Sequence, residues 1–158
     1  MNINKFTQKS IEAIQDIEKL AYEYGNQEMD QEHLVCALVN QMDGLIPKMI
    51  EKMEINLDHF KKRIVDYIEK KPKVQGGELR ISNDLNKVLV TAENEAKAMG
   101  DEYVSVEHLF LTLLKNPNRA MKEFLGEYGI TRERFLQALA TVRGNQKVTS
   151  DNPEATYD

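Results

Sequence analysis

Apolar residues recur every three or four positions through most of the chain, and this period predicts α-helices. Six of the apolar stripes follow a residue whose side-chain oxygen can accept the free N–H groups of a first helical turn. These capping residues are Thr7, Asp30, Asn56, Ser82, Ser105 and Thr131. Two more stripes begin near Leu45 and Pro117. No alternating pattern of strand length competes, so the sequence predicts an all-α fold.

One phrase occurs twice in the chain. Gly25–Val39 is written GNQEMDQEHLVCALV and Gly100–Leu114 is written GDEYVSVEHLFLTLL, at an offset of 75 residues. The same offset pairs Phe60 with Phe135 without any gap. A period this long indicates a unit of several elements. We therefore expect duplicated four-helix units, related by a pseudo-twofold axis, that form a compact eight-helix bundle.

The repeats have recognisable boundaries. Repeat one covers about residues 6–70, and repeat two covers about 81–144. The segment 71–80 between them contains Pro72 and the pair Gly76-Gly77, which break the helical period and indicate a linker. We expect 1–144 to form one domain. Residues 145–158 are polar and lack an apolar stripe, so this segment is expected to be flexible.

Composition narrows the class of protein. The chain has 158 residues, of which 41% are hydrophobic and 30% charged, and its formal net charge is -5. Neither half is basic, which argues against a nucleic-acid partner. Cys36 is the only cysteine and lies in an apolar helical stretch, so we expect an inert thiol in a reducing compartment. No signal core or membrane span is visible, and a cytoplasmic protein without a membrane partner is expected.

The sequence contains none of the common catalytic motifs. The chain has no phosphate-binding loop of the Walker kind and no Gly-x-Ser-x-Gly turn around a nucleophile. His33 and His108 occupy the same position in the two repeats, but each has only a glutamate as an adjacent ligand. We interpret them as capping or core residues rather than metal ligands. The sequence therefore predicts no metal site, no catalytic residue and no enzymatic activity for this chain.

Some candidate functional residues have a counterpart of the same kind in the other repeat. Thr7 matches Ser82, and Glu107 matches Glu32. A helix cap accounts for the first pair, and an acid beside the positive end of a helix accounts for the second. Loss of either group should therefore impair folding as well as function.

Two other candidates differ in kind between the repeats. Asp101 matches the neutral Asn26, so its charge exceeds what the turn needs. We accordingly expect Asp101→Asn to change stability by no more than roughly 0.5 kcal/mol, as is usual for surface changes. Val90 matches Gln15 and lies off the inward stripe of its helix, so it is a candidate for a binding patch.

The duplicated units with their EHL triplets, the second written GDEYVSVEHLFLTLL, resemble the amino-terminal domain of the Clp ATPases. The opening KFTQK, the linker KPKVQGG and the ending VTSDNPEATYD are similar to the ClpB branch of this family, the protein disaggregases. The resemblance covers essentially the whole chain and implies the double Clp N motif.

This resemblance implies a module at the edge of a hexameric, ATP-driven threading machine, where it engages unfolded or aggregated proteins. ATP and Mg would belong to ATPase domains outside this sequence, and 145–158 would lead toward the first of them. The chain alone is expected to be a monomer without a cofactor. The family's functional positions match Thr7, Asp101 and Glu107, and Leu89 by position would contribute to an apolar groove.

Three functions remain open at this point. The first is capture of exposed apolar segments in a groove between the repeats, followed by transfer to the ATPase ring. The second is docking of adaptors, as in the protease-associated ClpA and ClpC types, through a charged rim. The third, a stand-alone helical enzyme, would require a convergent polar pocket. High salt should weaken charged docking while leaving apolar capture intact or stronger.

Overall fold

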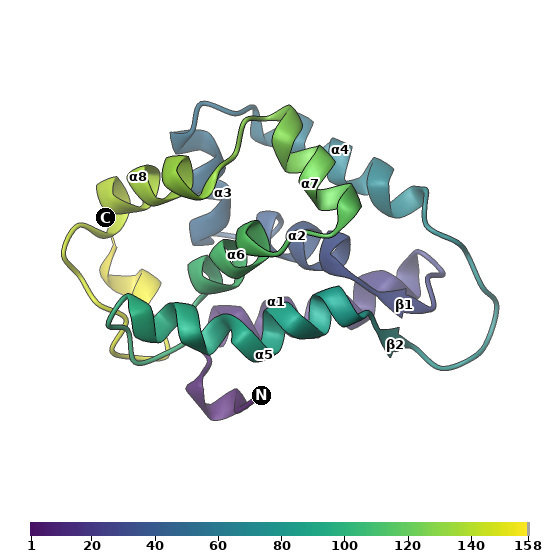
Figure 1. Cartoon of the computed structure of the whole chain (residues 1–158), viewed down its shortest axis with the longest axis horizontal. Helices are drawn as coiled ribbons and strands as arrows, with labels where there is room; N and C mark the ends of the chain where they lie inside the picture. The colour runs from purple at the N-terminus through teal and green to yellow at the C-terminus, as the bar shows by residue number, and fades with distance from the viewer. Residues whose placement is uncertain (158) are drawn as a thin grey trace.

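The computed structural model describes residues 1–157 and contains eight α-helices over that range, four in each repeat (Figure 1). The helices of repeat one are α1 (Gln8–Glu23), α2 (Gln31–Val39), α3 (Leu45–Lys52) and α4 (Leu57–Glu69). Thr7 caps α1, because its side chain accepts a hydrogen bond from the Ser10 amide. Asn56 caps α4 in the same way through the His59 amide. The prediction of these helices from their apolar stripes is confirmed.

Repeat two has the same order of helices. They are α5 (Asn83–Ala98), α6 (Val106–Lys115), α7 (Arg119–Glu127) and α8 (Arg132–Arg143). Ser82 and Thr131 cap α5 and α8 through the amides three residues later. α7 begins after Asn118 rather than at Pro117, because the Asn118 side chain accepts from the Met121 amide. The all-α, duplicated fold predicted from the sequence is confirmed.

Two short parallel contacts between the repeats were not expected. β1 (Glu28–Met29) pairs with β2 (Arg80–Ile81), and Phe6 forms an isolated bridge with Val104. At the repeat offset, Phe6 and Val104 stand at the positions of Ile81 and Met29. Each contact therefore joins the residues before the first helix of one repeat to those before the second helix of the other. Segments this short carry no alternating signal in the sequence.

The centre of the molecule is formed by α2 and α6. Every residue of α2 is buried, and α1 contacts α6 while α5 contacts α2 across the pseudo-twofold relation. Two aromatic pairs extend this core, with ring centroids 4.8 Å apart in both: Phe110 stacks on Phe135, and Phe60 packs on Phe124. A helix that is apolar nearly all round is expected to be buried in this way.

The segment after α8 differs from the expected flexible tail in one respect. It folds back beside the end of α5 and forms the short helix η2 (Pro153–Thr156) (Figure 1). Val148 is fully buried and Tyr157 nearly so. Single buried residues without a helical period leave no stripe to recognise. The packed arrangement covers 145–157, and Asp158 lies outside the described residues. Flexibility of this segment stays a prediction.

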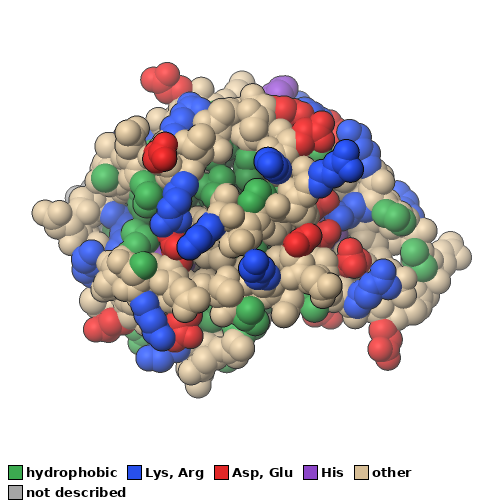
Figure 2. Space-filling model, viewed as in Figure 1, with side chains coloured by type: hydrophobic (Ala, Val, Ile, Leu, Met, Phe, Trp, Pro, Cys, Tyr) green, Lys and Arg blue, Asp and Glu red, His purple; other side chains and the backbone are tan. Residues whose placement is uncertain are grey.

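The surface carries no large region of one charge sign on the face shown in Figure 2, where basic and acidic side chains are interspersed. This distribution agrees with the small net charge of the chain. Among the described helices, none is both long enough and apolar enough to span a bilayer.

Candidate functional site

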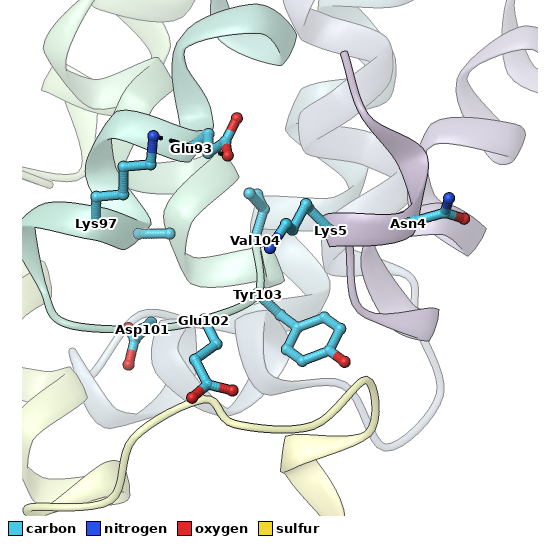
Figure 3. A pocket seen from close by; sticks show the side chains of 9 residues that line it. Asn4, Lys5, Glu93, Lys97, Asp101, Glu102, Tyr103 and Val104 are labelled. Carbon is cyan, nitrogen blue, oxygen red and sulfur yellow. Dashed lines mark ion pairs between the residues drawn. The ribbon is translucent and has the colours of Figure 1, made fainter.

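A cavity of about 390 Å³ lies on repeat two, beside the bridge between Phe6 and Val104 (Figure 3). One wall is the second half of α5, with Glu93, Ala96 and Lys97. Residues 4–5 and the loop 101–104 form the remaining walls. The lining includes both acids and lysines together with the apolar residues Ala96 and Val104, so the cavity offers charge of either sign.

Thr7 does not line this cavity but supports its wall. Its side chain is fully buried and donates a hydrogen bond to Ser10 Oγ at 2.9 Å. Ser10 Oγ in turn donates to the Val104 carbonyl at 3.0 Å, and the Thr7 amide donates to the same carbonyl at 2.9 Å. Thr7 therefore caps α1 and fixes Val104, which lines the cavity. Its contribution to the site is positional.

Asp101 lines the cavity and also belongs to a buried polar cluster, which we call the repeat-two cluster and which comprises Asp101, Glu107, His108 and Arg143. The Asp101 carboxylate accepts hydrogen bonds from both terminal nitrogens of Arg143, at 2.7 and 3.0 Å. It also lies 2.7 Å from His108 Nε2 and accepts from the Val148 amide at 3.0 Å. Burial would raise the pKa of Asp101, but the hydrogen bonds from His108 and Arg143 outweigh it and hold the pKa well below its usual range.

The tautomer of His108 follows from its neighbours. Its Nδ1 accepts a hydrogen bond from the Ser105 amide at 2.8 Å, so the neutral ring carries its proton on Nε2 and donates it to Asp101. His33 accepts from the Asp30 amide at 3.0 Å in the same way. The interpretation of both histidines as capping and core residues is confirmed.

Glu107 is fully buried and less well satisfied than Asp101. One carboxylate oxygen lies 3.3 Å from Arg143, and the other has no hydrogen-bond partner among the described residues. Burial raises the pKa of Glu107, and the neighbouring His108 and Arg143 offset only part of that increase. Glu107 therefore pairs with Arg143 in addition to complementing the positive end of α6.

The expected surface character of Asp101 is wrong. Only 6% of the residue is exposed, and its charge is paired with Arg143 inside the domain. Asn26 needs no charge at the equivalent place because its environment differs. It lies 2.9 Å from His33 Nε2 and donates to the Pro72 carbonyl. The difference between the repeats therefore has a structural cause, and the change Asp101→Asn would leave Arg143 with one carboxylate fewer.

The two apolar candidates have different environments. Leu89 is 7% exposed and belongs to the core, so it offers little surface to a ligand. Val90 is 49% exposed, as its position off the inward stripe predicted. It precedes Glu93 by one helical turn and so lies on the α5 face that continues into the cavity. The structure thus brings Asp101 and Glu107 together around Arg143, places Thr7 against Val104 in the cavity wall, and leaves Val90 exposed on α5 outside the cavity lining.

Arg143 is the main residue that sequence reasoning missed. At the repeat offset it stands at the position of Ile68, which is fully buried. A basic residue at a core position of the pattern needs an acidic partner, because an unpaired buried charge is costly. That signal pointed to a buried ion pair, although it could not show that the partner was Asp101.

Repeat one has a corresponding repeat-one cluster, which comprises Asp30, Glu32, Lys71, His33 and Asn26. Lys71 Nζ lies 2.9 Å from Glu32 and 3.1 Å from Asp30. Burial is the largest influence on His33 and, with the charge of Lys71, lowers its pKa to about 4. Two residues near repeat two's helix starts complete this cluster. Ser82 donates a hydrogen bond to Asp30, and Asn118 donates to both Asp30 and Glu32.

Neither cluster contains a metal-binding arrangement. Over the described residues, no group of three or more histidine, cysteine, aspartate or glutamate side chains is placed to hold an ion. Cys36 is buried, and its burial raises the pKa of the thiol to about 11, which keeps the thiol protonated at neutral pH.

Comparison with known proteins assigns the class. The description "Clp repeat (R) N-terminal domain" matches residues 5–128, and the chain belongs to this family. The whole chain is 42% identical to "Chaperone protein ClpB" of Nitratidesulfovibrio vulgaris and 41% identical to the ClpB of Clostridium perfringens. It covers 19% of the length of each, so it corresponds to the amino-terminal domain of a Clp ATPase rather than to a whole one.

Solved structures show the same fold at lower identity. The N-terminal domain of Hsp104 from Candida albicans superposes with a TM-score of 0.83 at 21% identity, and the match covers 95% of this chain and 99% of that one. A ClpV N-domain in complex with a VipB peptide superposes with a TM-score of 0.71 at 18% identity, covering 87% and 86% of the two chains. These likenesses concern the fold alone.

Proposed function

We propose that this chain is the amino-terminal, client-engaging module of a ClpB-type chaperone. It binds exposed apolar segments of unfolded or aggregated proteins and passes them to the ATPase ring of its own protein, which lies outside this sequence. Whole-chain similarity to ClpB proteins supports this proposal. The ATP and Mg needed for disaggregation would bind to that ring, in a cytoplasmic hexamer.

The observation that carries the proposal is the exposed face of α5 beside the cavity. Val90, Glu93 and Lys97 follow one another at spacings of three and four residues, so they form one stripe. Ile3 is 42% exposed on the segment that supplies the opposite wall. Apolar groups thus flank a cavity whose polar groups can meet a peptide backbone. The ClpV N-domain complex supports the idea that this fold can hold a peptide.

Binding should be weak. A shallow surface has little area to offset the cost of ordering a flexible chain, so we expect micromolar or poorer affinity. The test is fluorescence anisotropy of a labelled, unfolded apolar peptide with the isolated chain. Val90→Ser should weaken binding about fivefold, on the order of 1 kcal/mol for an apolar side chain that a partner covers.

Tyr22→Ser is the matched control, because Tyr22 is 80% exposed on α1 and lies away from the cavity. This variant should bind the peptide as the wild type does. Equal weakening by both variants would contradict the site, and absence of any binding would contradict the function.

Adaptor docking of the ClpA and ClpC type is the second candidate, because lysines and glutamates surround the cavity (Figure 3). Salt separates the two functions. Apolar capture should persist in 1 M salt, where the Debye length is only about 3 Å, whereas charged docking should be lost. Loss of peptide binding under these conditions, with the fold intact, would favour the adaptor function.

A further inference from the structure

The segment 145–157 is hydrogen-bonded to repeat two at Val148 and to repeat one at Asp151. The Val148 amide donates to Asp101 Oδ1 at 3.0 Å, and the Val148 carbonyl accepts from the Glu102 amide at 2.8 Å. Further along, the Asp151 carbonyl accepts from the Gln8 amide at the start of α1, also at 2.8 Å. Figure 3 shows the Asp101 and Glu102 side chains directed toward this segment, which is drawn in yellow. The segment thus connects the repeat-two cluster to the amino-terminal end of α1.

The linker after α4 uses the same kind of contacts on repeat one. The Val74 amide donates to the Gly25 carbonyl at 2.8 Å, and Lys73 Nζ donates to the Tyr24 carbonyl at 3.0 Å. In repeat two, Lys147 Nζ donates to the Met99 carbonyl at 2.8 Å, and Met99 is the counterpart of Tyr24 at the repeat offset. Each repeat therefore has a docking site for the chain that leaves it. The first of these chains continues into α5 of repeat two, whereas the second reaches α1 of repeat one through Asp151.

The docked segment also contains groups that oppose docking. Both carboxylate oxygens of Glu154 and the hydroxyl of Tyr157 are buried without a hydrogen-bond partner among the described residues. One carboxylate oxygen of Glu107 is also buried without a hydrogen-bond partner among the described residues. Burying a polar group without a partner disfavours the docked state, because the group loses its hydrogen bonds to water. The apolar contribution of Val148 and Tyr157 is therefore partly offset, and the docked state is only moderately stable.

We propose that residues 145–157 form a releasable strap, that Asp101 and Arg143 are its docking site, and that it undocks as a unit while the helical domain stays folded. Docked, the strap places the end of the domain beside α1. Released, an extended segment of this length could span about 40 Å. Docking itself does not depend on the proposed client binding, but its use in orienting the domain toward an ATPase ring does.

Amide hydrogen exchange on the chain 1–158 tests the strap directly. In the wild type, the Val148, Glu102 and Gln8 amides should exchange with one shared free energy of opening, lower than that of core amides such as Leu38. Gln8→Pro removes the donor to Asp151 and should preserve α1, because proline is favoured at the first helical position. This variant should accelerate exchange at Val148 and Glu102 about tenfold, equivalent to about 1.4 kcal/mol.

Asn83→Pro is the matched control, because Asn83 holds the same position at the start of α5 and does not contact the strap. It should leave the Val148 and Glu102 amides unchanged. A second variant, Val148→Asp, places a carboxylate beside Asp101 and should release Gln8 and Glu102 together without affecting Leu38. Unprotected Val148 in the wild type, or unchanged Val148 exchange in Gln8→Pro, would overturn the proposal. Simultaneous loss of protection at Leu38 in Val148→Asp would show that the strap cannot undock separately.

Discussion

The two repeats place buried polar clusters at the starts of α2 and α6, and the clusters differ in what they hold together. In repeat one, Lys71 pairs with Glu32 and Asp30, while Asn118 and Ser82 reach the same carboxylates from repeat two. In repeat two, the members are Asp101, Glu107, His108 and Arg143, and the group they receive is the Val148 amide. The first cluster joins the two repeats, whereas the second binds the segment that leaves the domain.

This difference shows how a duplicated fold can acquire separate roles without a change of backbone. Both clusters keep a histidine on the third helical residue and a glutamate on the second. The repeats differ in the group that faces the histidine, which is the amide of Asn26 in repeat one and the carboxylate of Asp101 in repeat two. They also differ in the residue that supplies the cation. Arg143 ends α8, whereas Lys71 follows α4 in the linker. In repeat two, where Arg143 lies within hydrogen-bond distance of the position that faces the histidine, the residue is the acid Asp101.

The largest effect is expected from Arg143→Met. This change leaves Asp101 and Glu107 buried without their cation, and loss of one partner of a buried pair typically costs about 3–5 kcal/mol. Urea unfolding followed by circular dichroism measures it. Lys71→Met is the control in repeat one, where the side chain is 16% exposed and the loss should be smaller. An equal or larger loss for Lys71→Met would contradict the comparison.

The next largest effect is a loss of stability at acidic pH, which depends on His33. The pKa of His33 is lowered to about 4 in the folded chain, whereas an unfolded histidine titrates near 6.5. The unfolded state therefore binds more protons between these values, and the contribution of His33 to stability decreases as pH falls from about 6.5 to about 4. The full loss is about 3 kcal/mol.

An NMR titration of the His33 ring in the folded chain checks this acid effect, because other groups also titrate at low pH. His33→Gln should flatten the dependence of the unfolding free energy on pH in the same interval. Protonation of the folded ring near pH 6.5 would be inconsistent with its burial beside Lys71 and Asn26.

A smaller loss is expected from Asp101→Asn, which keeps the shape of the side chain but replaces one acceptor oxygen with an NH2 group that cannot accept from His108 or Arg143, and leaves the other oxygen neutral. Bonds to charged groups contribute about 1.5–3 kcal/mol, so we expect a loss of about 2 kcal/mol. Glu107→Gln is the control within the same cluster. Its pKa is raised, which means that folding disfavours its ionised form, so this change should cost less. A melt of Asp101→Asn indistinguishable from wild type would restore the original expectation.

The smallest effects should come from the matched caps. Thr7→Ala and Ser82→Ala each remove one side-chain acceptor at the start of a helix, and such losses typically cost about 1 kcal/mol. In thermal unfolding, the midpoint temperatures of both variants should therefore be lower than that of the wild type by similar amounts. A much larger loss for Thr7→Ala would mean that its support of Val104 contributes more to stability than its cap.

The helices, their caps and the duplication could all be predicted from the amino-acid sequence. These features depend on neighbours within one or two turns, so an apolar period and a capping oxygen are enough to predict them. The exposed Val90 was predictable for the same reason. The candidates Thr7, Asp101 and Glu107 were identified through family resemblance, and the sequence supported only capping or dipole roles for two of them.

The contacts of those residues depend on how distant helices pack together. Asp101 and Arg143 are 42 residues apart, and their pairing depends on how the end of α8 packs against the start of α6. The position of the C-terminal segment depends on single contacts of Val148 and Tyr157, which have no periodic pattern. Periodicity assigns residues to a face of a helix, but the partner of a buried charge is set by which faces of separate helices meet.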